Sequence, residues 1–599
     1  MRRLLAWALA AALAGCAAPE AREAAALVQP EGASGTVAKP GWATRHFAVA
    51  AANPIAVQTG YRIIKEGGSA VDAAVAMQMV LALVEPQSSG LGGGAFLLHH
   101  DGQKTEAFDG RETAPAAADE KLFLGPDGQP LPMRQAIVGG RAVGVPGAVA
   151  MLEQVHRLHG RLPWPRLLEP AIALSENGFA LSPRLHALVT SDRDLKSDPI
   201  AASYFYDADG RPWPVGHRLR NPELGAVLRL VAAQGAKALS EGEVAQSIVN
   251  KVRMHPTNPG RLALTDLAGY RPLRRDPLCF DHAAVAREYR VCGMPPPSSG
   301  AITIGQTLGI LATTPATRLP LENGVPGAQW LHLYAEASRL AFADRAQYVA
   351  DPDFVRAPAR VWTSLLDPAY LRQRASLIGP SRMATAPAGR PGGESVGFAP
   401  MPPQEEYGTS HISIVDPQGR AVAMSTSVES AFGSRQMVNR GRGLAGGFLL
   451  NNQLSDFSFQ PADAEGRPVA NRVQPGKRPR SAMSPTLVFD KATGHLAMSV
   501  GSSGGTMIIH STAKTLYGIM NWGLDAQAAI ALPNFGALGE GPFLVEQTVF
   551  PETTMSSLRD RGHRLAVVRV PTGLQAITRT ANGFFSGTDP RREGIVAGD

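Results

Sequence analysis

A glycine–threonine pair about two-thirds of the way along the chain constrains its fold and chemistry more than any other feature. Gly408 and Thr409 come shortly before the β-branched, strand-like run Ile412–Val415. Glycine has no side chain to obstruct a hydroxyl that attacks its carbonyl carbon. We therefore predict that the Thr409 hydroxyl attacks the Gly408 carbonyl. Hydrolysis of the resulting ester would leave Thr409 as a new N-terminus.

An N-terminal threonine would carry both a nucleophile and a base. Its hydroxyl can attack a carbonyl carbon while its free α-amine takes up the proton. An α-amine titrates near pH 7.7–8.0 in model compounds, about two units below lysine, so it can act as a base at neutral pH. A Gly-Thr pair before a strand is more often only a turn. The interpretation therefore depends on the rest of the chain.

Residues 1–15 resemble an export signal. Arg2 and Arg3 give a positive start, and the apolar stretch Leu4–Leu13 that follows is too short to cross a bilayer as a helix. The letters LAGC, which end at Cys16, then resemble the bacterial lipoprotein signal, in which the cysteine becomes the lipidated first residue. We therefore expect a lipoprotein-type signal peptide and lipidation of this cysteine. An ordinary secretory signal is the alternative.

The residues after this signal predict where the protein resides. Ala17 follows the cysteine in place of aspartate, which in the lipoprotein system favours the outer membrane. Residues 16–44 are rich in Ala, Gly and Pro without apolar periodicity, so they predict a flexible tether. We expect an exported, periplasmic protein that is held at the outer membrane by its lipid anchor.

Composition excludes several classes of protein. The net charge of +7 over 599 residues is small and is not gathered in Lys/Arg blocks with interleaved aromatics, which argues against nucleic-acid binding. No zinc-type Cys/His spacing and no phosphate-binding G-x-x-x-x-G-K-[ST] loop occurs, and we expect no metal or organic cofactor. With Cys16 lipidated, Cys279 and Cys292 remain. They form either a disulfide or two buried thiols, because spacing alone does not fix their geometry.

The apolar pattern divides the chain at about residue 409. Helical periodicity dominates before it, and short strands dominate after it. The segment 379–408 is rich in Pro, Gly and Ala and predicts a linker that ends at the cleavage site. The expected helices are 56–65, 70–84, 146–158, 164–177, 224–235, 241–253, 300–313, 327–349 and 367–378. The expected strands are 96–100, 105–108, 411–415, 421–425, 446–450, 484–489 and 495–500, the last followed by a helix to about residue 521.

Several short motifs, weak one by one, occur in an order and spacing that together resemble the γ-glutamyltransferase family of the N-terminal-nucleophile hydrolase superfamily. They are Lys65–Gly68 with Ala70–Ala74, Gly90–Gly94, Gly408–His411, Leu450–Gln453, Lys477–Pro479, Met483–Thr486 and Gly501–Gly505. The resemblance extends from about residue 45 to 590. It implies an α+β fold, a four-layer αββα sandwich built from two subunits of one precursor. Here the large subunit would be 45–408 and the small subunit 409–599.

The resemblance also implies an activity. Such an enzyme cleaves γ-glutamyl amides such as glutathione through a threonyl acyl-enzyme, and passes the glutamyl group to water or to the amine of an amino acid or peptide. Its two subunits form a heterodimer. Two alternatives stay open at this point: a related acylase, such as a cephalosporin acylase, on the same scaffold, and a non-catalytic envelope lipoprotein that only binds a ligand or partner.

The family motifs imply the catalytic groups. Thr409 matches the nucleophile. Ser425 and Ser427 alternate along one expected strand, so their side chains share a face. They match two family threonines, one of which hydrogen-bonds the nucleophile. We assign that role to Ser427 and place Ser425 among the substrate-binding residues. Gly504 and Gly505 match an oxyanion hole, in which backbone N–H groups face the developing negative charge.

The family motifs also imply which groups bind the donor's carboxylate. Arg111 matches the arginine that binds the glutamyl α-carboxylate, since a planar guanidinium can grip a carboxylate with two hydrogen bonds. A salt bridge from Arg111 to Glu112 or another acid is the alternative interpretation. Ser481 matches a second carboxylate contact, but the neighbouring family serine is Ala482 here.

The implied ammonium site contains one departure from the family. Asp456 matches the acid that pairs with the substrate α-ammonium, and Gln453 matches a neighbouring contact. Glu429 stands where the best-known members carry asparagine. The carboxylate of Glu429 is either a second acid that binds the substrate α-ammonium group or the mark of a different substrate. Residues 460–475 match a lid loop over the pocket.

Overall fold

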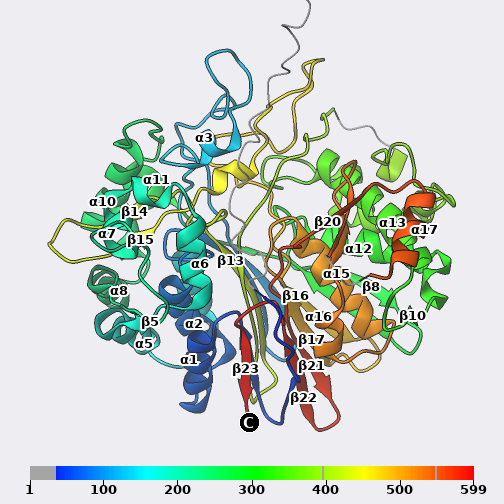
Figure 1. The fold of residues 1–599 in the computed structure, drawn as a ribbon, viewed down its shortest axis with the longest axis horizontal. Coiled ribbons are helices and arrows are strands. Elements are labelled where there is room, and N and C mark those ends of the chain that lie inside the picture. Colours follow the sequence, from blue (N-terminus) through cyan, green and yellow to red (C-terminus); the bar gives the residue numbers. More distant parts are fainter. Residues whose placement is uncertain (1–34, 394–396, 547–549) are drawn as a thin grey trace, which may run out of the picture.

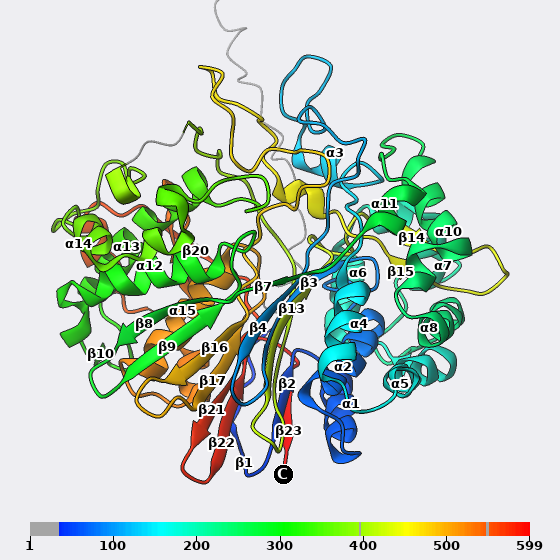
Figure 2. The same ribbon diagram turned by 180° about the vertical axis from the view of Figure 1, so that it is seen from behind.

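Two seven-stranded antiparallel sheets lie face to face at the centre of the molecule, with helices outside both of them (Figure 1). The computed structural model describes residues 35–393, 397–546 and 550–599. The apolar side chains between the sheets include Phe96, Leu98 and Leu487. The structure therefore confirms the expected αββα sandwich, and the four layers can be followed from behind in Figure 2.

Strands from both sides of Thr409 make up each sheet. The first sheet has the order β23 (Ile595–Gly598), β2 (Ala48–Ala51), β12 (Ser410–Val415), β13 (Ala421–Ser427), β3 (Gly94–His100), β4 (Thr105–Gly110) and β7 (Leu273–Arg275). The second has the order β1 (Trp42–Thr44), β22 (Gly583–Thr588), β21 (Gln575–Thr580), β17 (Leu496–Gly501), β16 (Thr486–Asp490), β9 (Glu288–Gly293) and β8 (Leu278–Ala283). Backbone hydrogen bonds would therefore hold the two parts together if the chain were cut before Thr409.

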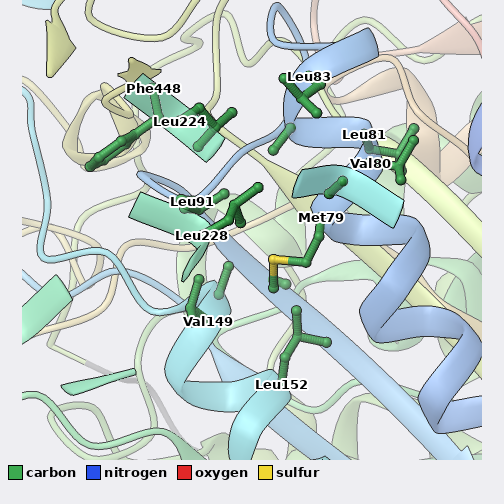
Figure 3. Packing of buried hydrophobic residues seen from close by; sticks show 14 of the residues in the cluster. Met79, Val80, Leu81, Leu83, Leu91, Val149, Leu152, Leu224, Leu228 and Phe448 are labelled. Carbon is green, nitrogen blue, oxygen red and sulfur yellow. The ribbon is translucent and has the colours of Figure 1, made fainter. Parts of the chain in front are cut away.

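One helical layer covers the first sheet. Its helices are α1 (Pro54–Lys65), α2 (Ala70–Val84), α4 (Ala148–His159), α5 (Trp164–Asn177), α6 (Pro183–Ser191), α7 (Pro199–Phe205), α8 (Pro222–Gln234) and α10 (Gly242–Arg253). Every residue of α2 is buried, as its apolar sequence predicts. Side chains of α2, α4 and α8 meet there, for example Met79, Val149 and Leu228 (Figure 3).

The opposite layer covers the second sheet. Its helices are α12 (Gly300–Ala312), α13 (Ala328–Tyr348), α14 (Pro368–Ala375), α15 (Met507–Met520), α16 (Ala526–Ala531) and α17 (Glu552–Asp560). Their apolar core contains Trp330, Tyr334 and Tyr517. A small sheet of β18 (Phe535–Ala537), β19 (Phe543–Glu546) and β20 (Leu565–Val568) flanks this layer. No helix among the described residues is long and apolar enough to span a membrane.

Four details differ from the sequence-based expectations or complete them. The predicted tether is wrong for its last residues, because β1 lies inside it and pairs with β22. Helices α6 and α7 were not expected. The predicted strand at 446–450 is reduced to β15 (Phe448–Leu449), which pairs with β14 (Met437–Val438) outside the main sheets. Cys279 and Cys292 are joined by a disulfide between β8 and β9. The predicted signal peptide and Cys16 lie outside the described residues.

Candidate active site

Thr409 lies at the start of a central strand of the first sheet. Strand β12 begins one residue later, and its register pairs Ser410 with Thr426 of β13. Continued by one residue, this register sets Thr409 opposite Ser427, and directly opposed side chains of an antiparallel pair point to the same side. The structure thus brings the predicted nucleophile and its predicted hydroxyl partner to the same end of two neighbouring strands.

Only glycine fits immediately before Thr409. Gly408 has a φ of +47°, and a Cβ atom at this position would lie 1.7 Å from the carbonyl oxygen of Glu429. A side chain here would therefore both clash with backbone and hold the chain in an unfavourable left-handed conformation. The Gly408 carbonyl, which the Thr409 hydroxyl is predicted to attack, therefore has no side chain beside it, and Gly408 lies against the loop after β13.

The two strand serines have different partners. The backbone N–H of Glu429 donates to Ser427 Oγ over 2.8 Å, so the Ser427 hydroxyl hydrogen stays available for another acceptor. Ser425 Oγ instead lies 2.9 Å from His411 Nδ1, and His411 Nε2 lies 3.0 Å from Ser413 Oγ. Burial lowers the pKa of His411 to about 3, so this ring is neutral. The structure does not bring Ser425 to the predicted substrate-binding groups, because its hydroxyl is engaged inside the sandwich.

The predicted oxyanion turn joins a strand to a helix. Strand β17 ends at Gly501 and α15 begins at Met507. Gly504 and Gly505 between them have φ values of +123° and +58°. A Cβ atom on Gly505 would lie 1.9 Å from the carbonyl oxygen of Glu406, so the chain before Thr409 lies against this turn. Free N–H groups at a helix N-terminus favour negative charge, which is what an oxyanion site requires.

Arg111 and Asp456 form a buried ion pair. Arg111 has no solvent exposure, and its Nη2 donates to Asp456 Oδ2 and, over 2.9 Å, to the carbonyl of Arg480. Its Nε donates to the carbonyl of Pro479 over 3.1 Å, and its Nη1 lies 3.7 Å from Glu112. Burial raises the pKa of Glu112 to about 8. The guanidinium is therefore held rigidly at the end of β4, next to a second acid.

Short local structure positions the predicted ammonium site. Asp456 ends the 3₁₀ helix η6 (Gln453–Asp456), and Gln453 Nε2 donates to Asp456 Oδ2 over 2.8 Å. Glu429 lies in the left-handed region with a φ of +77°, which is a strained backbone for a residue with a side chain. Burial, and secondly the Asp456 carboxylate, raise the pKa of Glu429 well above its usual value. Two buried carboxylates that repel each other in this way favour a proton or a cation nearby.

Ser481 lies beside the same arginine. Its Oγ accepts from the backbone N–H of Met483 over 3.1 Å, which leaves its own hydrogen available to donate. Ala482, which follows, is buried and offers no hydroxyl. Because Arg111 donates to the carbonyls of Pro479 and Arg480, the segment that carries Ser481 is fixed relative to the guanidinium.

Buried polar atoms without a hydrogen-bond partner gather in this cluster. Within the described part of the chain they include Arg111 Nη1, Glu429 Oε2, Gln453 Oε1 and Asp456 Oδ1. Such atoms are rare in folded proteins, since each costs about 1–3 kcal/mol when left unpaired. The predicted residues Arg111, Glu429, Gln453 and Asp456 therefore form a buried polar cluster with atoms that could still pair with a cation and an anion.

Sequence reasoning missed three charged residues of this region. Glu406 lies three residues before Thr409, and its Oε1 accepts from Arg345 Nη2 over 2.6 Å. Arg480 Nη2 donates to the same oxygen over 3.4 Å. Arg345 lies near the end of α13 and Arg480 between two family motifs. The available signal was the charged residue Arg345 within an expected helix, but the sequence does not show that this position is buried.

Two other features lie outside this cluster. A cavity of about 1190 Å³ is lined by Arg134, Arg141, Lys251 and Arg440, among others, and by none of the predicted site residues. His99, Glu106 and His159 are the one group among the described residues whose ligand atoms could hold a metal ion, within 4.8 Å of one another. Arg274 also pairs with Glu106. Neither feature touches Thr409.

Comparison with known proteins identifies the family of this chain. The model of the family described as Gamma-glutamyltranspeptidase matches residues 56–599. The chain is 33% identical to the glutathione hydrolase proenzyme of Bacillus subtilis over 564 residues, covering 92% of this chain and 91% of the relative. It is 31% identical to the Acylase ACY 1 proenzyme of a Pseudomonas species, covering 89% and 90%. The crystal structure of cephalosporin acylase from Bacillus halodurans superposes with a TM-score of 0.79 at 26% identity, covering 96% and 99%.

A sandwich of two antiparallel sheets between helical layers, with a threonine at the start of a central strand, defines an N-terminal-nucleophile hydrolase fold. Within that class, the family match and the identity over nine-tenths of the sequence decide the assignment. The chain belongs to the gamma-glutamyltranspeptidase family.

Proposed function

We propose that this protein is an autoprocessing γ-glutamyltransferase that cleaves γ-glutamyl amides of the glutathione class. The observation that carries the proposal is the buried cluster of Arg111, Glu429 and Asp456, in which each side chain keeps one polar atom without a hydrogen-bond partner. A free α-amino acid end presents one carboxylate and one ammonium group. A guanidinium and two acids are complementary to that pair. The glutathione hydrolase relatives support the same substrate class.

The proposed maturation begins at the carbonyl of Gly408, which no side chain obstructs. The Thr409 hydroxyl attacks that carbonyl, the C–N bond breaks and the acyl group moves to the Thr409 oxygen. Water then hydrolyses the ester. The large subunit ends in a carboxylate at residue 408, and the small subunit, 409–599, begins with a free amine. Residues 379–408 would form the C-terminal linker of the large subunit. Shared strands in both sheets would keep the subunits together.

The proposed turnover uses the same hydroxyl. The α-amine takes the Thr409 hydroxyl proton as its oxygen attacks the donor amide carbon, and the oxyanion is stabilised by N–H groups of Gly504 and Gly505. The proton passes to the leaving amine, which departs. Water or an acceptor amine then attacks the threonyl ester and releases the glutamyl group. The Ser427 hydroxyl is free to orient the nucleophile. No organic cofactor or metal is required by these steps.

A second candidate function is that of a related acylase. Two observations favour it: Glu429 replaces the asparagine of the best-known family members, and Ala482 removes one hydroxyl from the carboxylate site. The acylase relative and the cephalosporin acylase structure carry such names. An acylase would not require both Arg111 and Asp456 to recognise a free amino acid end. Because this chain has both residues, they support the γ-glutamyltransferase proposal over the acylase.

We also propose export to the periplasm as a lipoprotein anchored through Cys16. The support is the signal-like sequence of residues 1–15 together with the disulfide between Cys279 and Cys292, because disulfides persist in oxidising compartments outside the cytosol. Metabolic labelling with a radioactive fatty acid, compared between the natural chain and Cys16→Ala, tests the anchor. Label that persists in the variant would contradict it.

Intact-mass analysis of the purified protein beside Thr409→Ala, with a γ-glutamyl-4-nitroanilide assay on both, tests the main proposal. We expect two fragments, the smaller starting at Thr409, and activity that disappears in the variant. Thr409→Ser is the matched control, since it retains a hydroxyl and should still cleave itself. Two fragments without γ-glutamyl activity would favour the acylase. An uncut and inactive natural chain would contradict both enzymes.

A further inference from the structure

The segment before the proposed cleavage site passes through the candidate active site. Gln404 Nε2 donates to the carbonyls of Ser455 and, over 2.9 Å, Phe457, which flank Asp456. The backbone N–H of Tyr407 donates to Glu429 Oε1 over 3.0 Å. The uncleaved segment 404–408 therefore occupies one carboxylate oxygen of Glu429, which we assign to the substrate, and the backbone on both sides of Asp456.

Within this segment, Glu406 is held by two buried arginines. Its Oε1 lies 2.6 Å from Arg345 Nη2 and 3.4 Å from Arg480 Nη2. The side chains of all three residues are only 5–6% exposed. Although burial acts to raise it, the two guanidinium groups keep the pKa of Glu406 below its usual value. The ion triad is thus an anion site whose present occupant belongs to the same chain.

The arginine pair is built to remain in place without Glu406. Arg345 Nε donates to Ser299 Oγ over 2.8 Å, and Arg480 Nη1 donates to the carbonyl of Arg345 over 3.3 Å. Arg480 precedes Ser481 in the chain, and Arg111 donates to the carbonyl of Arg480. These contacts tie the two guanidinium groups to α13 and to the proposed carboxylate site. None of them involves the segment that cleavage would release.

Cleavage would change the charge balance of this triad. Glu406 would then lie in a C-terminal tail that ends two residues later at Gly408 and is no longer joined to β12. If the tail leaves, two buried guanidinium groups lose their shared carboxylate. Uncompensated buried charges are costly, so the pair would favour any small anion that can enter. Burial and the neighbouring Arg345 lower the pKa of Arg480 to about 9, although Glu406 acts to raise it.

We propose that Arg345 and Arg480 form a second anion subsite of the mature enzyme, which binds a carboxylate of the donor additional to the one assigned to Arg111. The inference rests on the proposed function, and it narrows the donors to γ-glutamyl amides that carry a further carboxylate. That carboxylate could belong to the acyl group, as Glu406 lies on the acyl side of its own bond, or to the leaving amine.

Three donors with related chromophores separate these sources. γ-Glutamyl-4-nitroanilide has no further carboxylate, γ-glutamyl-3-carboxy-4-nitroanilide carries one on the leaving amine, and γ-carboxyglutamyl-4-nitroanilide carries one on the acyl group. We expect the natural enzyme to prefer one of the carboxylated donors in kcat/KM. Loss of a charged hydrogen bond typically costs about ten- to a hundred-fold in affinity. Arg480→Leu should therefore reduce the preference by about that factor and change kcat/KM for the plain donor far less.

Arg229→Leu is the matched control, since Arg229 is exposed on α8 and pairs with Glu176. Its donor preference should equal that of the natural enzyme. An unchanged preference in Arg480→Leu for both carboxylated donors would overturn the subsite while leaving the proposed function intact. If the cleaved natural protein turns over none of the donors, the proposed function fails, and the subsite is judged by binding alone.

The binding measurement uses the uncleaved chain and does not depend on turnover. Thr409→Ala keeps Glu406 in its site. The double variant Thr409→Ala/Glu406→Ala lacks the CH₂–COO⁻ end of Glu406. The space left between Arg345 and Arg480 then has about the size of an acetate ion. Acetate should raise the Tm of the double variant and not that of Thr409→Ala. Equal responses of the two proteins to acetate would contradict the subsite, including in the case that Arg480→Leu fails to fold.

Discussion

Arg111 and Asp456 lie 345 residues apart in the sequence and form one buried ion pair. Arg111 comes from the end of β4 and Asp456 from the short helix η6, on opposite sides of the proposed cleavage site. Each retains an atom without a hydrogen-bond partner, Arg111 Nη1 and Asp456 Oδ1. A donor with a free amino acid end could thus bind both groups while they stay close to each other, and we propose that the pair acts as one binding unit.

Replacement of Asp456 by asparagine tests this unit. Asp456→Asn leaves Arg111 buried beside a neutral amide, and breaking a buried pair typically costs about 3–5 kcal/mol in stability. We expect a lower Tm and a fall in kcat/KM for γ-glutamyl-4-nitroanilide of about ten- to a hundred-fold, mostly through KM, because one charge-assisted contact to the donor is lost. Steady-state kinetics and thermal unfolding measure the two effects. A variant with unchanged KM would show that Asp456 does not contact the donor.

Gly408→Ala should block maturation. The added Cβ would lie 1.7 Å from the Glu429 carbonyl oxygen, and the left-handed φ of +47° costs a non-glycine residue roughly 1–2 kcal/mol. The attacked carbonyl would then move away from the Thr409 hydroxyl. Denaturing electrophoresis should show a single uncleaved band, or cleavage slowed by orders of magnitude.

Gly397→Ala is the control for this experiment. Gly397 lies in the same linker, and a Cβ atom there meets nothing within 4 Å. This variant should cleave at the natural rate. Normal cleavage of Gly408→Ala would mean that the segment adapts freely and that the close fit at this glycine does not govern the reaction.

The two strand serines should respond differently to alanine. Ser425→Ala leaves His411 Nδ1 without its partner inside the sandwich, which costs about 1–3 kcal/mol in unfolding free energy. We expect little effect on kcat of the molecules that fold. Ser427→Ala removes the hydroxyl opposite Thr409 and the acceptor of the Glu429 N–H, so it should lower kcat by about ten- to a hundred-fold and also cost about 1–3 kcal/mol in unfolding free energy. Chemical unfolding and kinetics on both variants decide, and the reverse pattern would exchange their roles.

Stability should depend on pH through Glu85. Its carboxylate accepts from Ser410 Oγ over 2.9 Å, and burial raises its pKa to about 7 from a usual value of 4.5. The folded protein therefore holds this proton more tightly than the unfolded chain does, so stability falls as the pH rises from about 4.5 through 7 and stays lower above it. The full difference is on the order of 3 kcal/mol.

Glu85→Gln in the uncleaved Thr409→Ala background should remove this dependence. Its glutamine oxygen can still accept from Ser410, and it carries no charge at any pH. Chemical unfolding at pH 8 should find the double variant more stable than its Thr409→Ala parent, and at pH 4.5 the two should be nearly equal. A constant difference across this range would contradict the titration of Glu85.

The sequence was most informative where local pattern and chemistry coincide. The buried helix α2, the hairpin of β3 and β4, the glycine turn before α15 and the strand after Thr409 could all be predicted, because apolar periodicity and turn residues act over a few neighbouring positions. It was less informative for α6 and α7, which are only 9 and 7 residues long and show too few turns for a clear period. It was also less informative for β1, whose partner strand lies more than 500 residues away.

The sequence by itself determined the nucleophile candidate, the sandwich fold and the family, because these depend on residue types in a fixed order along the chain. Only the tertiary structure decided which charges face one another. The Ser425 hydroxyl bonds to His411 and not to the proposed donor-binding groups. Glu406, Arg345 and Arg480 come from three separate segments and form one ion triad. Such contacts depend on how the sheets and helices pack, and electrostatic interactions between buried groups act through space, so their partners cannot be read from spacing along the chain.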